Sequence, residues 1–227
     1  MCSRIGFVVM SFLLTVSSLD TNAVAGILLD PLGDAQLNSL GQPGIDLTSL
    51  EVTIGNTSVE VILNFSALTP ILPASAAAPN SVFGFVEFDL DLDPSTGSNP
   101  GLVDVFGSLI GQLPTGLGVD GTILLGSEAN QAGMVDLFFA SGATGLGTLT
   151  TTSTSMHISF SRSLLGGATE LNFAAVVGDF NVPTDATSVG FANVSAVPEP
   201  SSLWMMGFAG ALLIAVRPSR RRRSILG

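Results

Sequence analysis

The chain has 227 residues, of which 46% are hydrophobic and only 11% are charged. Eighteen acidic residues stand against seven basic ones, so the formal net charge is −11 at pH 7. Nucleic acid and anionic lipid headgroups are therefore poor partners, whereas divalent cations and neutral or cationic polymers are compatible with such a surface. The single cysteine, Cys2, cannot form a disulfide within the chain.

The first 25 residues have the pattern of a secretory signal peptide. Arg4 supplies a positive start, residues 5–16 are apolar, and Ala23-Val24-Ala25 forms a site of small residues before Gly26. We expect the secretion machinery to export the chain and signal peptidase to cleave it after Ala25. An anchor that stays uncleaved is the alternative, and the small-residue site argues against it.

Residues 26–196 have the length of one domain and contain sixteen of the acidic residues, with Arg162 as their only basic one. Apolar and polar residues alternate in several short segments, as is typical of half-buried strands. These segments are 50–54, 58–65, 86–93 and 155–160, with further strands expected at 122–125, 135–140 and 171–177. Many short strands separated by turn residues predict an all-β fold, an antiparallel β-sandwich.

Three segments of this domain do not read as strands. Residues 68–80 and 107–121 are predicted to be loops, and residues 164–167 fit one helical turn before a strand.

Acidic residues are densest at 87–93, where Glu87, Asp89, Asp91 and Asp93 alternate with apolar residues. On a strand these carboxylates would share one face, roughly 7 Å apart, and would repel one another. A calcium ion held by Asp89, Asp91 and Asp93 would offset that repulsion. An EF-hand is excluded, because positions six and twelve counted from Asp89 are both proline. A solvated acidic turn and a contact with substrate are the alternatives.

Catalytic residues are not evident, and we expect a protein that is not an enzyme. His157 is the only histidine, it stands among serines on the polar side of a strand, and no Gly-x-Ser-x-Gly elbow is present. Paired carboxylates would suit a polysaccharide hydrolase. With so many acidic residues, however, such pairs are expected by chance.

Short motifs along the domain resemble secreted bacterial β-sandwiches similar to DOMON-like domains and to family-nine carbohydrate-binding modules. The motifs lie at residues 30–35, 46–52, 88–97, 163–166, 176–179 and 183–185. The resemblance implies a jelly-roll-like sandwich and contact with glycans. The domain has no tryptophan or tyrosine on which sugars could stack, and this departure from the carbohydrate-binding modules argues against contact with glycans. Haem, which some DOMON domains bind, would have only His157, Met134 and Met156 as ligands.

The last 31 residues have three physically distinct parts. The first part is a stiff, proline-rich segment. The second is an uncharged apolar run at about 203–216, which we expect to be a single transmembrane helix. The third is a cationic cluster, which we expect to stay on the cytoplasmic side of the membrane. The first part contains Val197, Pro198, Glu199 and Pro200, and the cluster contains Arg217, Arg220, Arg221, Arg222 and Arg223. A buried core helix is the alternative for so short a run, but a core helix would show a polar face.

These three parts, in this order, resemble the PEP-CTERM sorting signal of Gram-negative bacteria, over residues 197–223. The resemblance implies that an exosortase, a membrane-embedded transpeptidase similar to cysteine proteases, recognises and removes the tail. We therefore expect a precursor anchored in the inner membrane and then a non-enzymatic protein of the cell surface or matrix, associated with exopolysaccharide in a biofilm. A calcium-dependent glycan-binding module is the alternative, followed by a secreted hydrolase.

Overall fold

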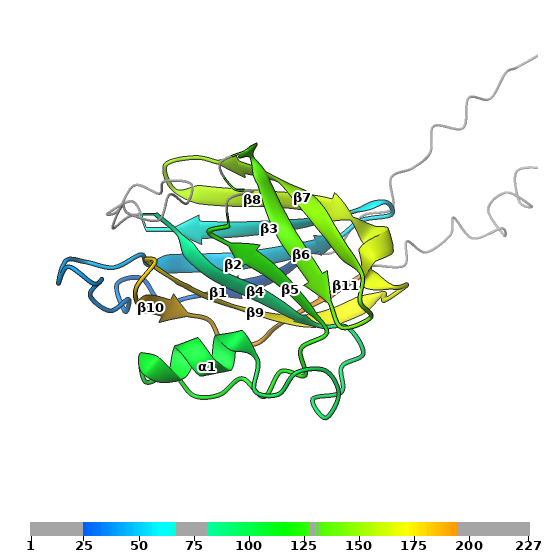
Figure 1. Cartoon of the computed structure of the whole chain (residues 1–227), viewed down its shortest axis with the longest axis horizontal. Helices are drawn as coiled ribbons and strands as arrows, with labels where there is room; N and C mark the ends of the chain where they lie inside the picture. The colour runs from blue at the N-terminus through cyan, green and yellow to red at the C-terminus, as the bar shows by residue number, and fades with distance from the viewer. Residues whose placement is uncertain (1–24, 67–80, 128–129, 131, 195–227) are drawn as a thin grey trace, which may run out of the picture.

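A computed structural model of the protein describes residues 25–66, 81–127, 130 and 132–194 (Figure 1). The described residues fold mainly into antiparallel strands, which are joined by turns and short helices. The strands are β1 (Ala25–Leu29), β2 (Leu47–Ile54), β3 (Ser58–Phe65), β4 (Phe83–Asp89), β5 (Gly121–Leu125), β6 (Met134–Phe139), β7 (Thr144–Thr151), β8 (Ser155–Ser161), β9 (Glu170–Gly178), β10 (Pro183–Ala186) and β11 (Gly190–Asn193). The helices are α1 (Leu102–Leu109) and η2 (Arg162–Leu165).

All strands belong to one curled sheet with the order β1-β2-β3-β8-β7-β6-β5-β4-β9-β10, and β11 also pairs with β9. The two ends of the sheet meet where β1 passes β11. There Gly26 lies so close to Phe191 that a Cβ would overlap the carbonyl oxygen of Phe191. The predicted all-β antiparallel fold is confirmed, and each of the seven predicted strands is present.

The main core fills the inside of the curled sheet, whose two halves face each other as in a β-sandwich. Leu63 on β3, Phe88 on β4, Ile123 on β5, Ile158 on β8 and Phe173 on β9 have no solvent exposure. Strands β3 and β5 bury every second residue and β8 does so along most of its length, which explains why their alternation was visible in the sequence.

A second, smaller core lies on the outer face of the sheet, under α1 (Figure 1). Val103 and Phe106 of α1 pack toward β4 and β9, where Val176 is buried and the rings of Phe85 and Phe106 stack with centroids 5.4 Å apart. Helix α1 ends at Leu109, so the prediction of a loop over 107–121 is wrong for its first residues. Because α1 covers its outer face, β9 is buried on both faces along most of its length.

Four strands were not predicted: β1, β7, β10 and β11. Strand β7 has the sequence TGLGTLTT, in which glycine and threonine hide the apolar alternation. Strands β10 and β11 have only four residues each, too few to show a period. The predicted helical turn at 164–167 overlaps η2, and the predicted loop at 68–80 lies outside the described residues.

Candidate functional site

The predicted acidic strand does not continue to Asp93. Strand β4 ends at Asp89, and the chain then turns through Leu92, which has a φ of 60°. Glu87 is not part of the group of carboxylates that the structure brings together. It is 2% exposed, and its two oxygens accept the backbone N–H groups of Leu102 (2.8 Å) and Val103 (2.9 Å) at the start of α1. The expectation that all four carboxylates share one strand face is therefore wrong.

Asp93 closes a turn and lies outside the group of carboxylates that the structure brings together. Its Oδ1 accepts the N–H (2.9 Å) and the hydroxyl (2.6 Å) of Ser95. These bonds, the one from the hydroxyl first, lower the pKa of the exposed Asp93. Asp93 thus fits the alternative of a solvated acidic turn better than that of a metal ligand.

Asp89 and Asp91 instead converge with Asp120, which sequence reasoning did not single out. Each offers a carboxylate oxygen, and these oxygens lie within 4.8 Å of one another. Asp120 directly precedes β5, whose first residue, Gly121, pairs with Phe88. The signal that could have located it is its place directly before the predicted strand 122–125, because β5 pairs antiparallel with β4.

Burial determines the electrostatics of this group. Asp89 is 1% exposed, and burial raises its pKa, while hydrogen bonds from Asn172 (3.3 Å) and the backbone of Leu92 act against the shift. Among the described residues, Oδ1 of Asp89 has no hydrogen-bond partner. Oxygen ligands alone, without histidine or cysteine, are what a hard cation such as Ca²⁺ prefers.

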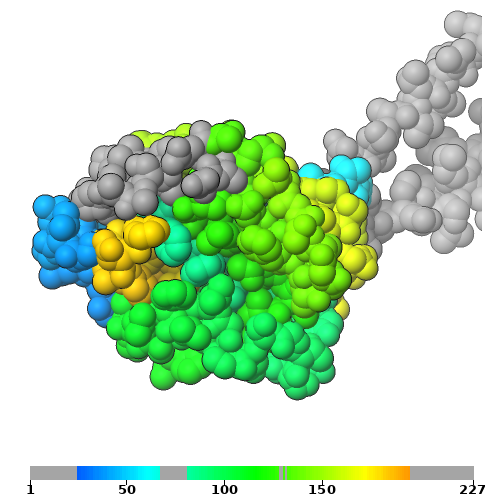
Figure 2. All heavy atoms as spheres, viewed as in Figure 1, coloured from blue at the N-terminus to red at the C-terminus, as the bar shows by residue number. Residues whose placement is uncertain are grey.

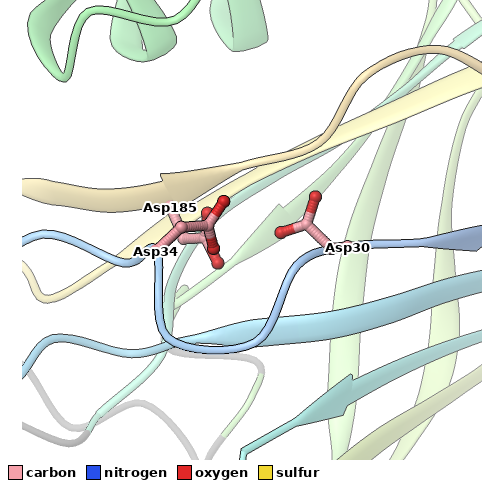
Figure 3. A group of neighbouring side chains, drawn as sticks. All are labelled: Asp30, Asp34 and Asp185. Atoms are coloured by element: carbon pink, nitrogen blue, oxygen red, sulfur yellow. The ribbon is translucent and has the colours of Figure 1, made fainter.

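A second group consists of Asp30, Asp34 and Asp185, whose carboxylate oxygens also lie within 4.8 Å of one another (Figure 3). Asp30 follows β1, Asp34 lies in the next turn, and Asp185 is on β10. The two segments meet at one end of the molecule, where the blue and gold surfaces adjoin in Figure 2 and Gln36 N donates to Thr184 O (2.8 Å). No local pattern in the sequence indicates this group, because its members come from opposite ends of the domain.

Two carboxyl groups of this second group, those of Asp30 and Asp185, have raised pKa values. Burial, with the charges of Asp30 and Asp34 adding to it, raises the pKa of Asp185 to about 8, although the N–H of Leu47 (2.8 Å) opposes the shift. Burial and then the charge of Asp34 raise the pKa of Asp30 to about 6. At neutral pH the group therefore retains a proton on Asp185, which lessens the repulsion among its carboxylates.

An aromatic hollow lies between α1 and the segment after β9, with Phe83, Phe85, Phe106 and Phe180 in its lining. Its volume is about 40 Å³. A pocket for a small organic ligand is typically larger than about 300 Å³, so this hollow is too small to enclose a sugar ring.

His157 is exposed on β8, as expected from its place on the polar side of the strand. One of its ring nitrogens, Nε2, lies 3.1 Å from the hydroxyl of Ser155, a contact between neighbours on one strand face. This arrangement gives no sign of an activated nucleophile.

Ala25, the predicted cleavage residue, begins β1 and pairs with Thr53. Cleavage after Ala25 would leave Gly26–Leu29 of this strand with the mature chain, and it stays a prediction. Within the ranges that the structure describes, no helix is long and apolar enough to cross a membrane. The sorting residues Val197, Pro198, Glu199 and Pro200, the transmembrane helix expected at about 203–216 and the arginine cluster lie outside these ranges.

The tail places the chain in a class of exported proteins. Residues 196–222 match the PEP-CTERM protein-sorting motif. The chain is thus an exported protein whose precursor is membrane-anchored at its C-terminus and is processed by an exosortase. No curated protein matches the chain, and the DOMON-like resemblance of the domain remains a prediction.

Proposed function

We propose that the protein is a non-enzymatic component of the cell surface or extracellular matrix of a Gram-negative bacterium, where it associates with exopolysaccharide. The sorting motif at 196–222 is the observation that carries this proposal, because it marks the chain as an exported protein processed by an exosortase. The domain that is delivered has sixteen acidic residues and one basic residue. Its negative field favours neutral or cationic polymers, or anionic ones bridged by divalent cations.

Reaction chemistry finds little support in the domain. The mature sequence contains no cysteine if the signal peptide is removed, and the ring of its single histidine lies 3.1 Å from the hydroxyl of the neighbouring Ser155.

The test is co-sedimentation of the secreted protein with exopolysaccharide purified from the same cells. We expect the protein to sediment with the polymer and to release no reducing ends from it. Loss of co-sedimentation in EDTA alone would favour the calcium-dependent glycan-binding module. Release of reducing ends that a single Asp or Glu substitution abolishes would establish the hydrolase instead.

A further inference from the structure

We propose that Asp89, Asp91 and Asp120 form a calcium site where β4 gives way to its turn and β5 begins. This site goes beyond the proposed role in the matrix and differs from the ligand set expected from sequence, since Asp120 takes the place of Asp93. The three side chains reach it from different parts of the fold: the last residue of β4, the following turn, and the residue before β5.

Backbone pairing fixes two of these residues against each other. Asp120 N donates to Phe88 O (2.8 Å), and Asp120 Oδ2 accepts the N–H of Leu90 (3.0 Å). Asp89 lies between Phe88 and Leu90 in the chain. These two backbone contacts therefore hold its carboxylate close to that of Asp120 without a bound ion. Both oxygens of Asp91 accept the Thr96 hydroxyl (3.0 Å), which holds its exposed carboxylate in the turn.

A ligand is needed because one oxygen of this group is buried without a donor. Asp89 is 1% exposed, and among the described residues its Oδ1 has no hydrogen-bond partner. A buried carboxylate oxygen without a partner is costly, and native structures rarely leave one. The sole basic side chain in 26–196 does not supply the missing charge, since Arg162 Nη1 donates to Gly55 O (3.2 Å). A diffusible cation, which the negative charge of this domain attracts, would be a suitable partner.

The size and chemistry of the group select calcium. Calcium binds oxygen at about 2.3–2.6 Å, so two of its ligands are separated by at most roughly 4.6–5.2 Å. The carboxylate oxygens of Asp89, Asp91 and Asp120 lie within 4.8 Å of one another, which is compatible with one calcium ion that contacts all three. Magnesium, at about 2.0–2.1 Å, demands a tighter and nearly octahedral arrangement, and transition metals favour imidazole or thiolate ligands.

A bound ion would fasten the end of β4 and the start of β5 to the turn that carries Asp91. Extracellular calcium modules have dissociation constants of about 10⁻⁴ to 10⁻³ M, which is the range we expect here. Because the ion binds the folded chain, the melting temperature should rise with calcium concentration.

The test measures binding to the full chain, purified in mild detergent and stripped with EDTA, by equilibrium dialysis against radioactive calcium. Asp91→Asn and Asp120→Asn should each weaken binding by about tenfold or more, and should abolish the calcium-dependent rise in melting temperature. Two variants that also remove one negative charge are the controls. Asp93→Asn keeps an oxygen for Ser95, and Asp34→Asn alters the other carboxylate group; both should bind calcium as the unaltered chain does.

Several results would overturn the proposal. The first is that the unaltered chain does not bind calcium at 10 mM, a concentration on the order of ten times the weakest expected dissociation constant. The second is that all four variants weaken binding equally. The third is that Asp34→Asn loses binding. Equal weakening would indicate an adventitious ion only, held by the net charge. Magnesium binding as tight as that of calcium would refute the choice of ion. Asp91 is exposed, so Asp91→Asn should fold, as circular dichroism can verify, and it decides the question if Asp120→Asn does not fold.

Discussion

Asp30, at the end of β1, and Asp185, on β10, place carboxylate oxygens within 4.8 Å of each other, although they come from opposite ends of the domain (Figure 3). Asp185 is 1% exposed, and both of its oxygens accept backbone N–H groups, from Leu47 (2.8 Å) and Ala186 (2.9 Å). Moving the Asp185 side chain into solvent would break both of these hydrogen bonds. Protonation of one carboxylate reduces the electrostatic repulsion between Asp30 and Asp185.

This pair predicts a pH dependence of stability. The folded pKa of Asp30 is raised to about 6 and that of Asp185 to about 8, so the folded state binds protons more tightly than the unfolded one. Their contribution to the free energy of unfolding is present below about pH 4 and is lost as the pH rises through 6 and then 8. Asp30→Asn should therefore be more stable than the unaltered chain at pH 8 and should lose that advantage at pH 4.

Urea unfolding in EDTA at a series of pH values measures this effect. The control is Glu170→Gln, which removes the same charge from an exposed position of β9. If both variants followed the same pH profile, general repulsion in an acidic domain would explain the result and the pair would have no special role.

Helix α1 should depend on Glu87 for its attachment to the sheet. The Glu87 carboxylate accepts the N–H groups of Leu102 and Val103, and Gly101 has no side-chain cap of its own. Glu87→Ala leaves both donors without this partner and should cost about 2 kcal/mol of stability. Denaturant unfolding provides the measurement. Glu60→Gln, on the exposed face of β3, should change stability by less than about 0.5 kcal/mol; a similar loss in both variants would contradict the capping role.

Two glycines with opposite surroundings give a matched pair of substitutions. A Cβ on Gly84 would overlap the carbonyl oxygen of Val176 where β4 pairs with β9, so Gly84→Ala should destabilise the fold by about 2 kcal/mol or more. A Cβ on Gly107 would meet its nearest neighbour, Gln112 Cβ, at 3.5 Å, an ordinary contact. Gly107→Ala should stabilise α1 by up to about 1 kcal/mol. Thermal melting of the two variants checks both signs, and a stable Gly84→Ala variant would show that β4 and β9 can separate.

Processing of the tail should require the acid between its two prolines. Glu199→Ala leaves the apolar run and the arginines intact, so the precursor should stay in the membrane but remain uncleaved. Gly210→Asp places a charge near the centre of the run, at a cost of roughly 2.5–3.5 kcal/mol for insertion, and should release unprocessed precursor into the soluble periplasm. Cell fractionation and mass spectrometry of the products distinguish these fates. Normal cleavage of Glu199→Ala together with retention of Gly210→Asp would contradict both expectations.

Intact Arg220–Arg223 on protein released by unaltered cells would argue against exosortase cleavage itself. The same mass spectra test signal-peptide removal, for which we expect a mature N-terminus at Gly26.

The sequence by itself determined the features that depend on neighbouring residues. Alternation along segments such as 58–65 and 155–160 predicted strands that the structure contains, because each of these strands buries only one face. The sorting signal could also be predicted from the sequence, because its motif, apolar run and arginines follow one another directly.

Only the tertiary structure decided which acidic residues meet. Asp120 joins Asp89 through the register of β4 and β5, and Asp185 reaches Asp30 because β10 adjoins the segment after β1. Asp93 leaves the group because the strand ends at Asp89, where the backbone turns. Register and turns bring distant residues into contact through long-range pairing, and no local period in a single sequence records that pairing.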